Sequence, residues 1–279
     1  MEQLLRNGCR YFHDGSHCSD LDLICIAVDQ LMARGLNPAD VAYVIHAHTQ
    51  AFSAPAAPVS VLSQLAQRYG WRTHMSFSVT HLACAAVGNA IQWAADLLRQ
   101  DARARYALVV TSDRVFGQAG YRIYQNSGMQ SDGGSAILIG RESLLGVLDR
   151  VTVLNYTQLF EGPSDAANIA AIARLTWLQT KKLFQQHAQD CGLPVDQMGT
   201  LLTINAALPY WKLIAKSLGL GMDQFFLDNI GKRGHAYCAD FAVNMADEGV
   251  RLLSEGQRVV YCAQSNVGAY AAIGWRPPS

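Results

Sequence analysis

The sequence predicts a mixed α/β fold made of two duplicated halves, and three observations lead to this prediction. The chain has 279 residues, enough for one large domain or two fused halves. Half of the residues are apolar and 16% are charged, a composition typical of a chain that buries a large core. Apolar strands alternate with amphipathic helices, and the order of these elements repeats along the chain at an offset of about 155 residues.

The first half is expected to alternate strands and helices. Leu21, Ile24, Val28 and Leu31 recur at helical spacing, and the turn Gly35–Pro38 ends their helix. Val- and Leu-rich runs such as Tyr106–Ser112 are typical of buried strands. The predicted helices cover residues 20–34, 58–69 and 82–100, and the predicted strands cover 41–49, 75–79, 106–112 and 135–139.

The second half repeats this order. A helix over residues 165–190 ends at Gly192-Leu193-Pro194, much as the first helix ends at its own glycine and proline. Strands follow at 200–204 and, after a helical segment, at 258–263. We therefore expect two halves, residues 1–145 and 146–279, with a nucleophilic cysteine in the first and a histidine and a glycine loop in the second.

Composition excludes several classes of function. The chain holds 22 basic and 22 acidic residues, so it has no general electrostatic attraction for nucleic acid or anionic membranes. The uncharged stretch 73–95 contains histidines, Asn89 and Gln92, which argues against a membrane span. Seven scattered cysteines without a C-x-x-C motif favour a reducing compartment. We expect a cytoplasmic protein without a signal peptide.

Cys84 is the first candidate for chemistry. It lies between a predicted strand and the start of a helix, in the small-residue run Ala83-Cys84-Ala85-Ala86. The free N–H groups and partial positive charge of a helix N-terminus favour a thiolate, which is a nucleophile. Small neighbours allow a substrate carbonyl to approach the Cys84 N–H as an oxyanion donor. The alternative is an ordinary buried cysteine that behaves as a small hydrophobic residue.

His235 is the second candidate. It follows Gly234 and precedes the next predicted helix, which we align with the position of Cys84 in the first half. Two halves related by a pseudo-twofold axis would bring these helix starts together, and a cysteine and a histidine meeting there form a nucleophile–base pair. The alternative is a histidine of a solvent-exposed turn.

The other histidines carry weaker signals. His46 and His48 share one face of a strand and could begin a metal site, but a third ligand is not evident. His81 lies three residues before Cys84 and could line the same pocket. The chain lacks the G-x-x-x-x-G-K-[ST], G-x-G-x-x-G and H-E-x-x-H motifs. We expect neither a metal nor a resident cofactor.

Several segments, taken in order, resemble the β-ketoacyl-acyl-carrier-protein synthase III family. These are the small-residue turn around Cys84, the strand YALVVTSD, the turn SDGGSAILIG, the helix end KSLGL and a loop containing Gly-His. The resemblance covers about residues 20–275. It implies a thiolase-like αβαβα layered fold of two duplicated halves, usually as a homodimer, whose substrates are coenzyme A or acyl-carrier-protein thioesters.

The resemblance also implies roles for individual residues. Cys84 would accept the acyl group, Gly268 would supply the second oxyanion N–H, and Phe52 would reach across a dimer interface into an acyl pocket. The histidine of condensing members falls on Ile204, or on Asn205 if the alignment slips by one residue, so Asn205 is expected to be an oxyanion-hole or substrate-binding residue. The usual asparagine of a Gly-Asn loop is His235, and Asp240 would orient that histidine, as in divergent biosynthetic relatives. The alternative for Asp240 is an ordinary acid in the first turn of a helix.

These departures favour acyl transfer over carbon–carbon condensation. Decarboxylation of a malonyl thioester leaves an enolate oxygen that needs two donors, and Ile204 supplies none. Losing one oxyanion donor costs on the order of 10²–10³ in rate. Transfer to oxygen, nitrogen or sulfur needs only a Cys84 thioester and a base. We expect a secondary-metabolic acyltransferase. A rearranged condensing enzyme, a thioesterase and a non-catalytic subunit of a ketosynthase-like heteromer remain alternatives.

The N-terminal region departs from the same family. Only about 20 residues precede the first predicted helix, and they lack the usual first strand of the sheet. Either that strand is missing, or residues 1–19 form a substitute. A missing strand would leave a sheet edge for a partner to cover.

Overall fold

The computed structural model describes residues 2–49, 58–115, 122–124, 128–142, 145–156 and 166–278, with only the backbone for Tyr124 and residues 166–169. The first sheet has four strands in the order β2-β1-β3-β6. Strands β1, β2 and β3 are parallel, and β6 pairs with β3 in the antiparallel sense. These strands confirm the four that were predicted and span Val41–Ala47 (β1), Met75–Val79 (β2), Tyr106–Asp113 (β3) and Gly133–Gly140 (β6).

The second sheet has five strands in the order β7-β11-β10-β8-β9. The predicted strands near 200–204 and 258–263 are confirmed as β8 and β10. The other three were not predicted, because β7 mixes charged and apolar residues, β11 is rich in alanine and β9 has two residues. The bounds are Val147–Asn155 (β7), Thr200–Thr203 (β8), Phe225–Phe226 (β9), Val259–Gln264 (β10) and Ala269–Arg276 (β11). A separate ribbon pairs β4 (Ile123–Tyr124) with β5 (Gly128–Met129).

The predicted helices lie close to their expected bounds. Ser19 caps the first of them through a reciprocal capping box with Asp22, which explains the start at Asp20. The helices are α1 (Glu2–Arg6), α2 (Asp20–Ala33), α3 (Val61–Tyr69), α4 (Ala86–Gln100), α5 (Ala166–Asp190), α6 (Leu208–Leu218), α7 (Asp228–Lys232), α8 (Asp240–Asn244) and α9 (Val250–Ser254). A π-helical turn, Met245–Gly249, joins α8 to α9. None of the described helices is long and apolar enough to cross a membrane.

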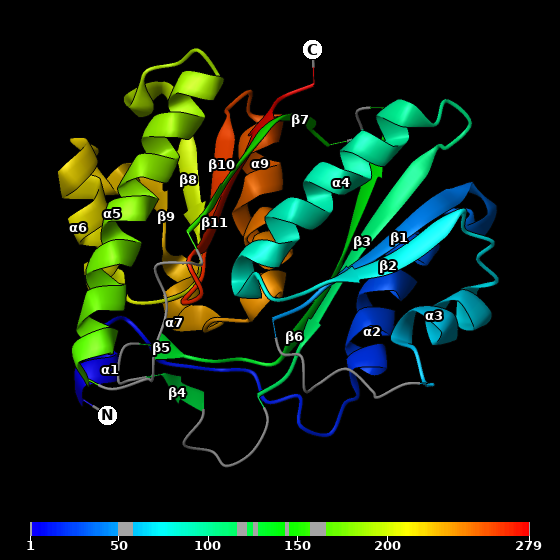
Figure 1. Cartoon of the computed structure of the whole chain (residues 1–279), viewed down its shortest axis with the longest axis horizontal. Helices are drawn as coiled ribbons and strands as arrows, with labels where there is room; N and C mark the ends of the chain where they lie inside the picture. Colours follow the sequence, from blue (N-terminus) through cyan, green and yellow to red (C-terminus); the bar gives the residue numbers. More distant parts are fainter. Residues whose placement is uncertain are drawn as a thin grey trace.

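The helices and sheets form five layers (Figure 1). Helices α2 and α3 cover the outer face of the first sheet, and α5 and α6 cover the outer face of the second. Helices α4, α8 and α9 lie between the sheets. Helix α4 contacts β1 and β3 of one sheet and β7 and β11 of the other. The predicted αβαβα fold is confirmed.

The side chains of β1 explain why helices cover both faces of the first sheet. Tyr43, Ile45 and Ala47 join the core that includes α4, whereas Val44 joins a second core beneath α2 and α3. Val41 also joins the second core, because the register shifts between Val41 and Tyr43. Strand side chains alternate between faces, so apolar residues on both faces require a helical layer on each side.

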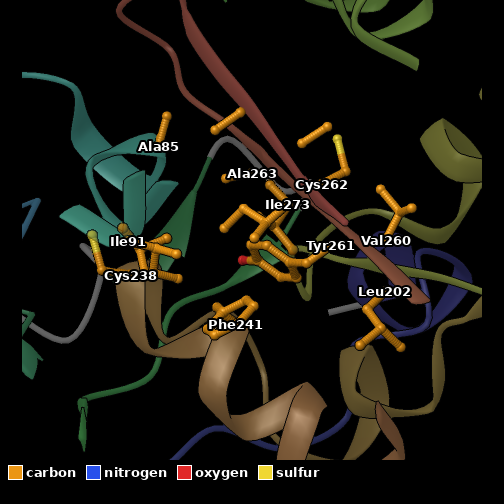
Figure 2. Close-up of a cluster of buried hydrophobic side chains, with 14 of the residues drawn as sticks. Ala85, Ile91, Leu202, Cys238, Phe241, Val260, Tyr261, Cys262, Ala263 and Ile273 are labelled. Atoms are coloured by element: carbon orange, nitrogen blue, oxygen red, sulfur yellow. The ribbon is translucent and has the colours of Figure 1, made fainter. Parts of the chain in front are cut away.

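A cluster of aromatic side chains fixes α8 against the second sheet. Figure 2 shows the Tyr261 ring of β10 between Phe241 of α8 and Ile273 of β11. The Tyr261 and Phe241 rings meet edge to face, with centroids 5.3 Å apart. This packing holds the N-terminus of α8 in place, and Asp240 is its first residue.

The two sheets differ at one edge. In the second sheet β7 pairs with the outer edge of β11, whereas no described strand pairs with the outer edge of the equivalent strand β6. Residues 2–19 do not replace it. The Asn7 carbonyl accepts from the Leu208 N–H, and the segment then contacts the start of β6 through the Gly15 N–H and the Asp132 carboxylate. The described residues therefore contain no strand at the place where the resemblance implies the first strand of the sheet.

Gly88 sets the distance between the two halves, and replacing it should destabilise the fold. A Cβ atom at Gly88 of α4 would lie 2.3 Å from the Ala271 Cβ of β11. Alanine ordinarily stabilises a helix by about 1 kcal/mol relative to glycine. We expect Gly88→Ala instead to lose about 1–3 kcal/mol through overpacking, measured by urea unfolding. Gln92→Ala, one turn further along α4, is the control and should change stability by less than about 1 kcal/mol. A stabilised Gly88→Ala variant would contradict this packing.

Buried His46 should make the protein sensitive to mild acid. Its Nε2 lies 2.9 Å from the Ser112 Oγ, and burial, together with His48, lowers its pKa to about 3. An unfolded histidine titrates near pH 6.5. Between these values the unfolded state binds one more proton, so stability falls as the pH falls, by about 1.4 kcal/mol per pH unit. We expect His46→Gln to lose the contribution of one histidine to the slope in urea unfolding between pH 6.5 and 5, while His187, whose pKa burial lowers to about 4, keeps its own contribution. An identical slope in both proteins would show that His46 does not carry the effect.

Candidate functional site

The Cys84 thiol lies at a tight turn between the first sheet and the central helix. Residues Ala83–Ala85 form a 3₁₀ turn that leads directly into α4. Cys84 is buried, with 7% of its surface exposed. Ala83 adopts φ +49°, in the left-handed region that non-glycine residues rarely occupy. Such strain often accompanies a functional site, and here it presents the thiol at the helix N-terminus as predicted.

His235 is positioned by backbone hydrogen bonds to β5 and to the residues that follow it. Its N–H donates to the Met129 carbonyl at 2.8 Å, and its carbonyl accepts from the Ser131 N–H at the same distance. Gly234 makes this approach possible. It has φ +68°, and a Cβ there would lie 2.8 Å from the Ser131 Oγ and 3.0 Å from the Met129 oxygen. The glycine of the Gly-His loop is therefore required by close packing as well as by its backbone conformation.

The two halves bring Cys84, His235 and Asp240 into one hydrogen-bonded chain. The Cys84 Sγ lies 3.2 Å from the His235 Nε2. The other ring nitrogen, Nδ1, lies 2.6 Å from the Asp240 Oδ2. The residues come from the turn before α4, the loop before α8 and the first residue of α8. A nucleophile, a histidine and a carboxylate thus stand in the order of a catalytic triad.

The Asp240 carboxylate is fully buried and has four donors. Its Oδ2 accepts from His235 and from the Asn205 N–H at 2.8 Å. Its Oδ1 accepts from the Ala236 N–H at 2.8 Å and the Asn205 Nδ2 at 3.1 Å. A buried charge is tolerated only when it is paired and hydrogen-bonded, and this one is both. Asp240 is also the first residue of α8, so both predicted placements of this acid hold at once.

The surroundings of His235 favour its charged form. Burial lowers the pKa of His235, but the charges of Cys84 and Asp240 and hydrogen bonds to both raise it well above its ordinary value. The His235 ring is therefore placed to carry a proton between the Cys84 sulfur and the Asp240 carboxyl group.

The alignment of the halves needs a correction at His235. The equivalent of Cys84 is Cys238, the middle residue of the 3₁₀ turn Tyr237–Ala239, which also leads directly into a helix. Tyr237 has φ +54°, close to the value at Ala83. The offset is 154 residues (238 − 84), so His235 corresponds to His81. The expected meeting of two helix starts is present, but His235 lies three residues before Cys238, the position equivalent to Cys84.

The predicted oxyanion loop around Gly268 forms a tight turn between β10 and β11. Gly268 has φ +79°, and its carbonyl accepts from the Tyr156 N–H at 2.8 Å. The Ser265 Oγ braces the turn by accepting from the Ala269 N–H at 3.0 Å. The turn that carries Cys84 contacts both β10 and β11, so the strands that Gly268 joins pack against the nucleophile.

The other predicted site residues have different outcomes. Asn205 directs its amide to Asp240, so it supports the carboxylate, a role that differs from the predicted contact with substrate. His81 is exposed, with φ +65°, and no contact with Cys84 is found for it among the described residues. Phe52 lies outside the described residues.

The strand histidines do not assemble a metal site. His46 and His48 stack with ring centroids 4.6 Å apart. Both are buried, and His46 contacts Ser112. In the part of the chain that the structure describes, no group of three His, Cys, Asp or Glu side chains is placed to hold a metal ion.

Two residues beside the nucleophile were not predicted. The Thr49 hydroxyl lies 3.7 Å from the Cys84 Sγ and 3.6 Å from the Cys238 Sγ. A repeated His-x-x-Cys-Ala pattern, at His81–Ala85 and His235–Ala239, could have identified Cys238. Thr49 follows a strand without any such pattern, and only the fold brings it to the site.

No protein-family model and no curated protein matches this sequence. Solved structures do match. ChlB3, described as an acyltransferase, has a TM-score of 0.83 at 15% identity over 100% of this chain and 90% of its own. The 3-oxoacyl-(acyl carrier protein) synthase III, FabH, of Pseudomonas aeruginosa PAO1 has a TM-score of 0.79 at 17% identity over 100% and 89%. AbyA1, a tetronic acid condensing enzyme, has 0.75 at 18% identity over 98% and 90%.

These similarities extend over nearly the whole of each chain and agree with the two sheets and five layers described above. At these identities they establish the architecture, and the resemblance found in the sequence is confirmed at that level. The chain has the thiolase-like fold of the β-ketoacyl-acyl-carrier-protein synthase III structures.

Proposed function

We propose that this chain is an acyltransferase, which accepts an acyl group on Cys84 from a coenzyme A or carrier-protein thioester and transfers it to an oxygen, nitrogen or sulfur acceptor. The hydrogen-bonded chain from Cys84 through His235 to Asp240 is the observation that carries this proposal. The similarity to ChlB3, described as an acyltransferase, supports it.

The first half-reaction uses the ion pair. The Cys84 thiolate attacks the donor carbonyl, and a new carbon–sulfur bond forms as the carbonyl oxygen becomes an oxyanion. When the donor carbon–sulfur bond breaks, the His235 imidazolium protonates the departing thiolate from Nε2. The products are acyl-Cys84, the free donor thiol and a neutral histidine.

Acylation itself prepares His235 for the second half-reaction. The charge of Cys84 is one of the causes that raise the pKa of His235, and acylation removes that charge. The neutral Nε2 can then accept the proton of an acceptor O–H, N–H or S–H as the acceptor attacks the acyl carbon. Cys84 leaves as a thiolate, and the ion pair is restored. Asp240 holds Nδ1 throughout and keeps the ring directed at the nucleophile.

The same geometry disfavours decarboxylative condensation. That reaction needs donors on the enolate oxygen, but His235 is the one histidine that contacts Cys84 among the described residues. Ile204 is buried and apolar where condensing members have a histidine. The experiments below distinguish acyl transfer from condensation, from thioester hydrolysis and from a non-catalytic role.

The metabolic role and the oligomeric state of the protein are proposed as well. A place in secondary metabolism is supported by AbyA1, described as a tetronic acid condensing enzyme. Exposed Met75 on edge strand β2 and Trp93 nearby on α4 support a homodimer or a ketosynthase-like heteromer. A cytoplasmic location and the absence of a resident cofactor stay predictions.

Mixing the protein with acyl-coenzyme A and acyl-carrier donors should add the mass of one acyl group. Intact-protein mass spectrometry measures this gain, and Cys84→Ala should abolish it because the accepting thiol is lost. Acyl-enzyme that decays without an acceptor would identify a thioesterase. Carbon dioxide release from a malonyl thioester would identify a condensing enzyme. A wild-type protein that gains no mass from a broad donor panel would favour the non-catalytic subunit.

His235→Ala should slow transfer from preformed acyl-Cys84 by about 10²–10⁴-fold, because the acceptor then lacks its base. The rate is measured in single turnover after excess donor has been removed. His74→Ala is the matched control, since His74 also pairs with an aspartate, Asp101 at 3.0 Å, but on the protein surface. The control should transfer at the wild-type rate. Equal rates for His235→Ala and wild type would overturn the proposed base.

A further inference from the structure

Cys238 is a second thiol of the site that the acyl-transfer mechanism does not use. It is the counterpart of Cys84 in the second half, and none of its surface is exposed. Burial and the charges of Asp113 and Cys84 raise the pKa of Cys238 well above its ordinary value. It therefore stays an S–H group and acts as a hydrogen-bond donor, whereas Cys84 acts as a nucleophile.

The Cys238 thiol donates to the peptide group that precedes the nucleophile. Its Sγ lies 3.5 Å from the carbonyl oxygen of Ala83. The same oxygen accepts from the Ala86 N–H, which closes the 3₁₀ turn. Two donors therefore fix the Ala83 carbonyl: the Ala86 N–H of its own turn and the Cys238 thiol of the other half.

This contact determines the direction of the Cys84 N–H. In a trans peptide the carbonyl and the following N–H point to opposite sides, so fixing the Ala83 carbonyl fixes the Cys84 N–H. That N–H forms no backbone hydrogen bond within the described chain, whereas the next one, of Ala85, donates to Leu82. It is therefore free of the turn and available to an oxyanion.

The strain at Ala83 shows why an external donor is needed. A non-glycine residue at φ +49° costs about 1–3 kcal/mol and persists only when its surroundings hold it. Rotation about the Ala83 N–Cα bond to an ordinary negative φ would relieve this strain and would displace the Ala83 carbonyl and the Cys84 N–H with it. The Cys238 thiol opposes such a rotation from a neighbouring rigid element, the turn before α8.

We propose that Cys238 is a positioning residue whose thiol holds the Ala83 carbonyl, so that the Cys84 N–H faces the oxyanion formed when Cys84 is acylated. The inference rests on the proposed function for its biological substrate, but it concerns the oxyanion and applies to any activated acyl donor. An attack on an alkyl halide forms no oxyanion and does not depend on this N–H.

Two reactions of Cys84 test the proposal. The first is acylation by p-nitrophenyl acetate, followed as the p-nitrophenolate burst. The second is alkylation by iodoacetamide, followed by peptide mapping of Cys84. Variants Cys238→Ala and Cys238→Val both remove the donor, one with a smaller side chain and one with a larger, and Cys238→Ser keeps a donor. We expect acylation to fall at least tenfold in the alanine and valine variants, with alkylation within twofold of wild type, and the serine variant to acylate normally.

Three results would contradict the positioning role of Cys238. Unchanged acylation in either donorless variant would overturn the proposal. So would equal losses in acylation and alkylation, since these would show that Cys238 acts by packing alone. If the alanine and valine variants fail to fold, slow acylation by a folded Cys238→Ser variant would overturn it, and normal acylation would support it.

Failure of the proposed function would have a different signature. A wild-type protein acylated at Cys84 by p-nitrophenyl acetate, but by no coenzyme A or carrier thioester, would overturn the acyltransferase proposal and leave the role of Cys238 standing. A wild-type protein that is alkylated at Cys84 but never acylated by p-nitrophenyl acetate would overturn the role of Cys238.

Discussion

The site depends on one buried charge, the Asp240 carboxylate. Burying a carboxylate costs free energy unless its oxygens are hydrogen-bonded, and four donors from three residues bind them here. One of those donors is His235, so a single hydrogen bond both stabilises the buried carboxylate and orients the imidazole. The other donors are the backbone and amide of Asn205 and the backbone of Ala236. The end of β8, the loop before α8 and α8 itself are therefore tied together at the point where the histidine must be directed at Cys84.

Much of the fold could be predicted from the sequence, because its elements carry local signals. Strands such as β3 are continuous apolar runs, and α2 has a capping residue, helical spacing and a terminal glycine turn. Among the strands that escaped prediction, β7 and β11 lack such signals. Charged Asp149 and Arg150 interrupt the apolar residues of β7, and β11 is held by pairing with two neighbours, which a local pattern does not contain.

The site was predictable where its residues belong to motifs, and less so elsewhere. Cys84 and His235 were found through their places before helices, and Asp240 through a resemblance. The alignment of the halves was wrong by three residues because helix starts were matched in place of the repeated cysteines. Asn205 was predicted as an oxyanion or substrate-binding residue, but its amide serves Asp240. Thr49 and the Ala83 carbonyl gain their roles from contacts between distant segments, which sequence spacing does not reveal.

The duplication also explains why the two halves are chemically unequal. Each half has a turn of the form His-x-x-Cys-Ala, but the next residue is Asp240 in one and Ala86 in the other. Asp240 binds His235, the buried histidine three residues before Cys238, whereas Ala86 has no group to bind His81, which is exposed. A single carboxyl group therefore breaks the internal symmetry of the molecule. In the proposed mechanism, one turn contributes the thiol that forms the acyl bond, and its copy contributes the imidazole and the thiol that positions the first turn.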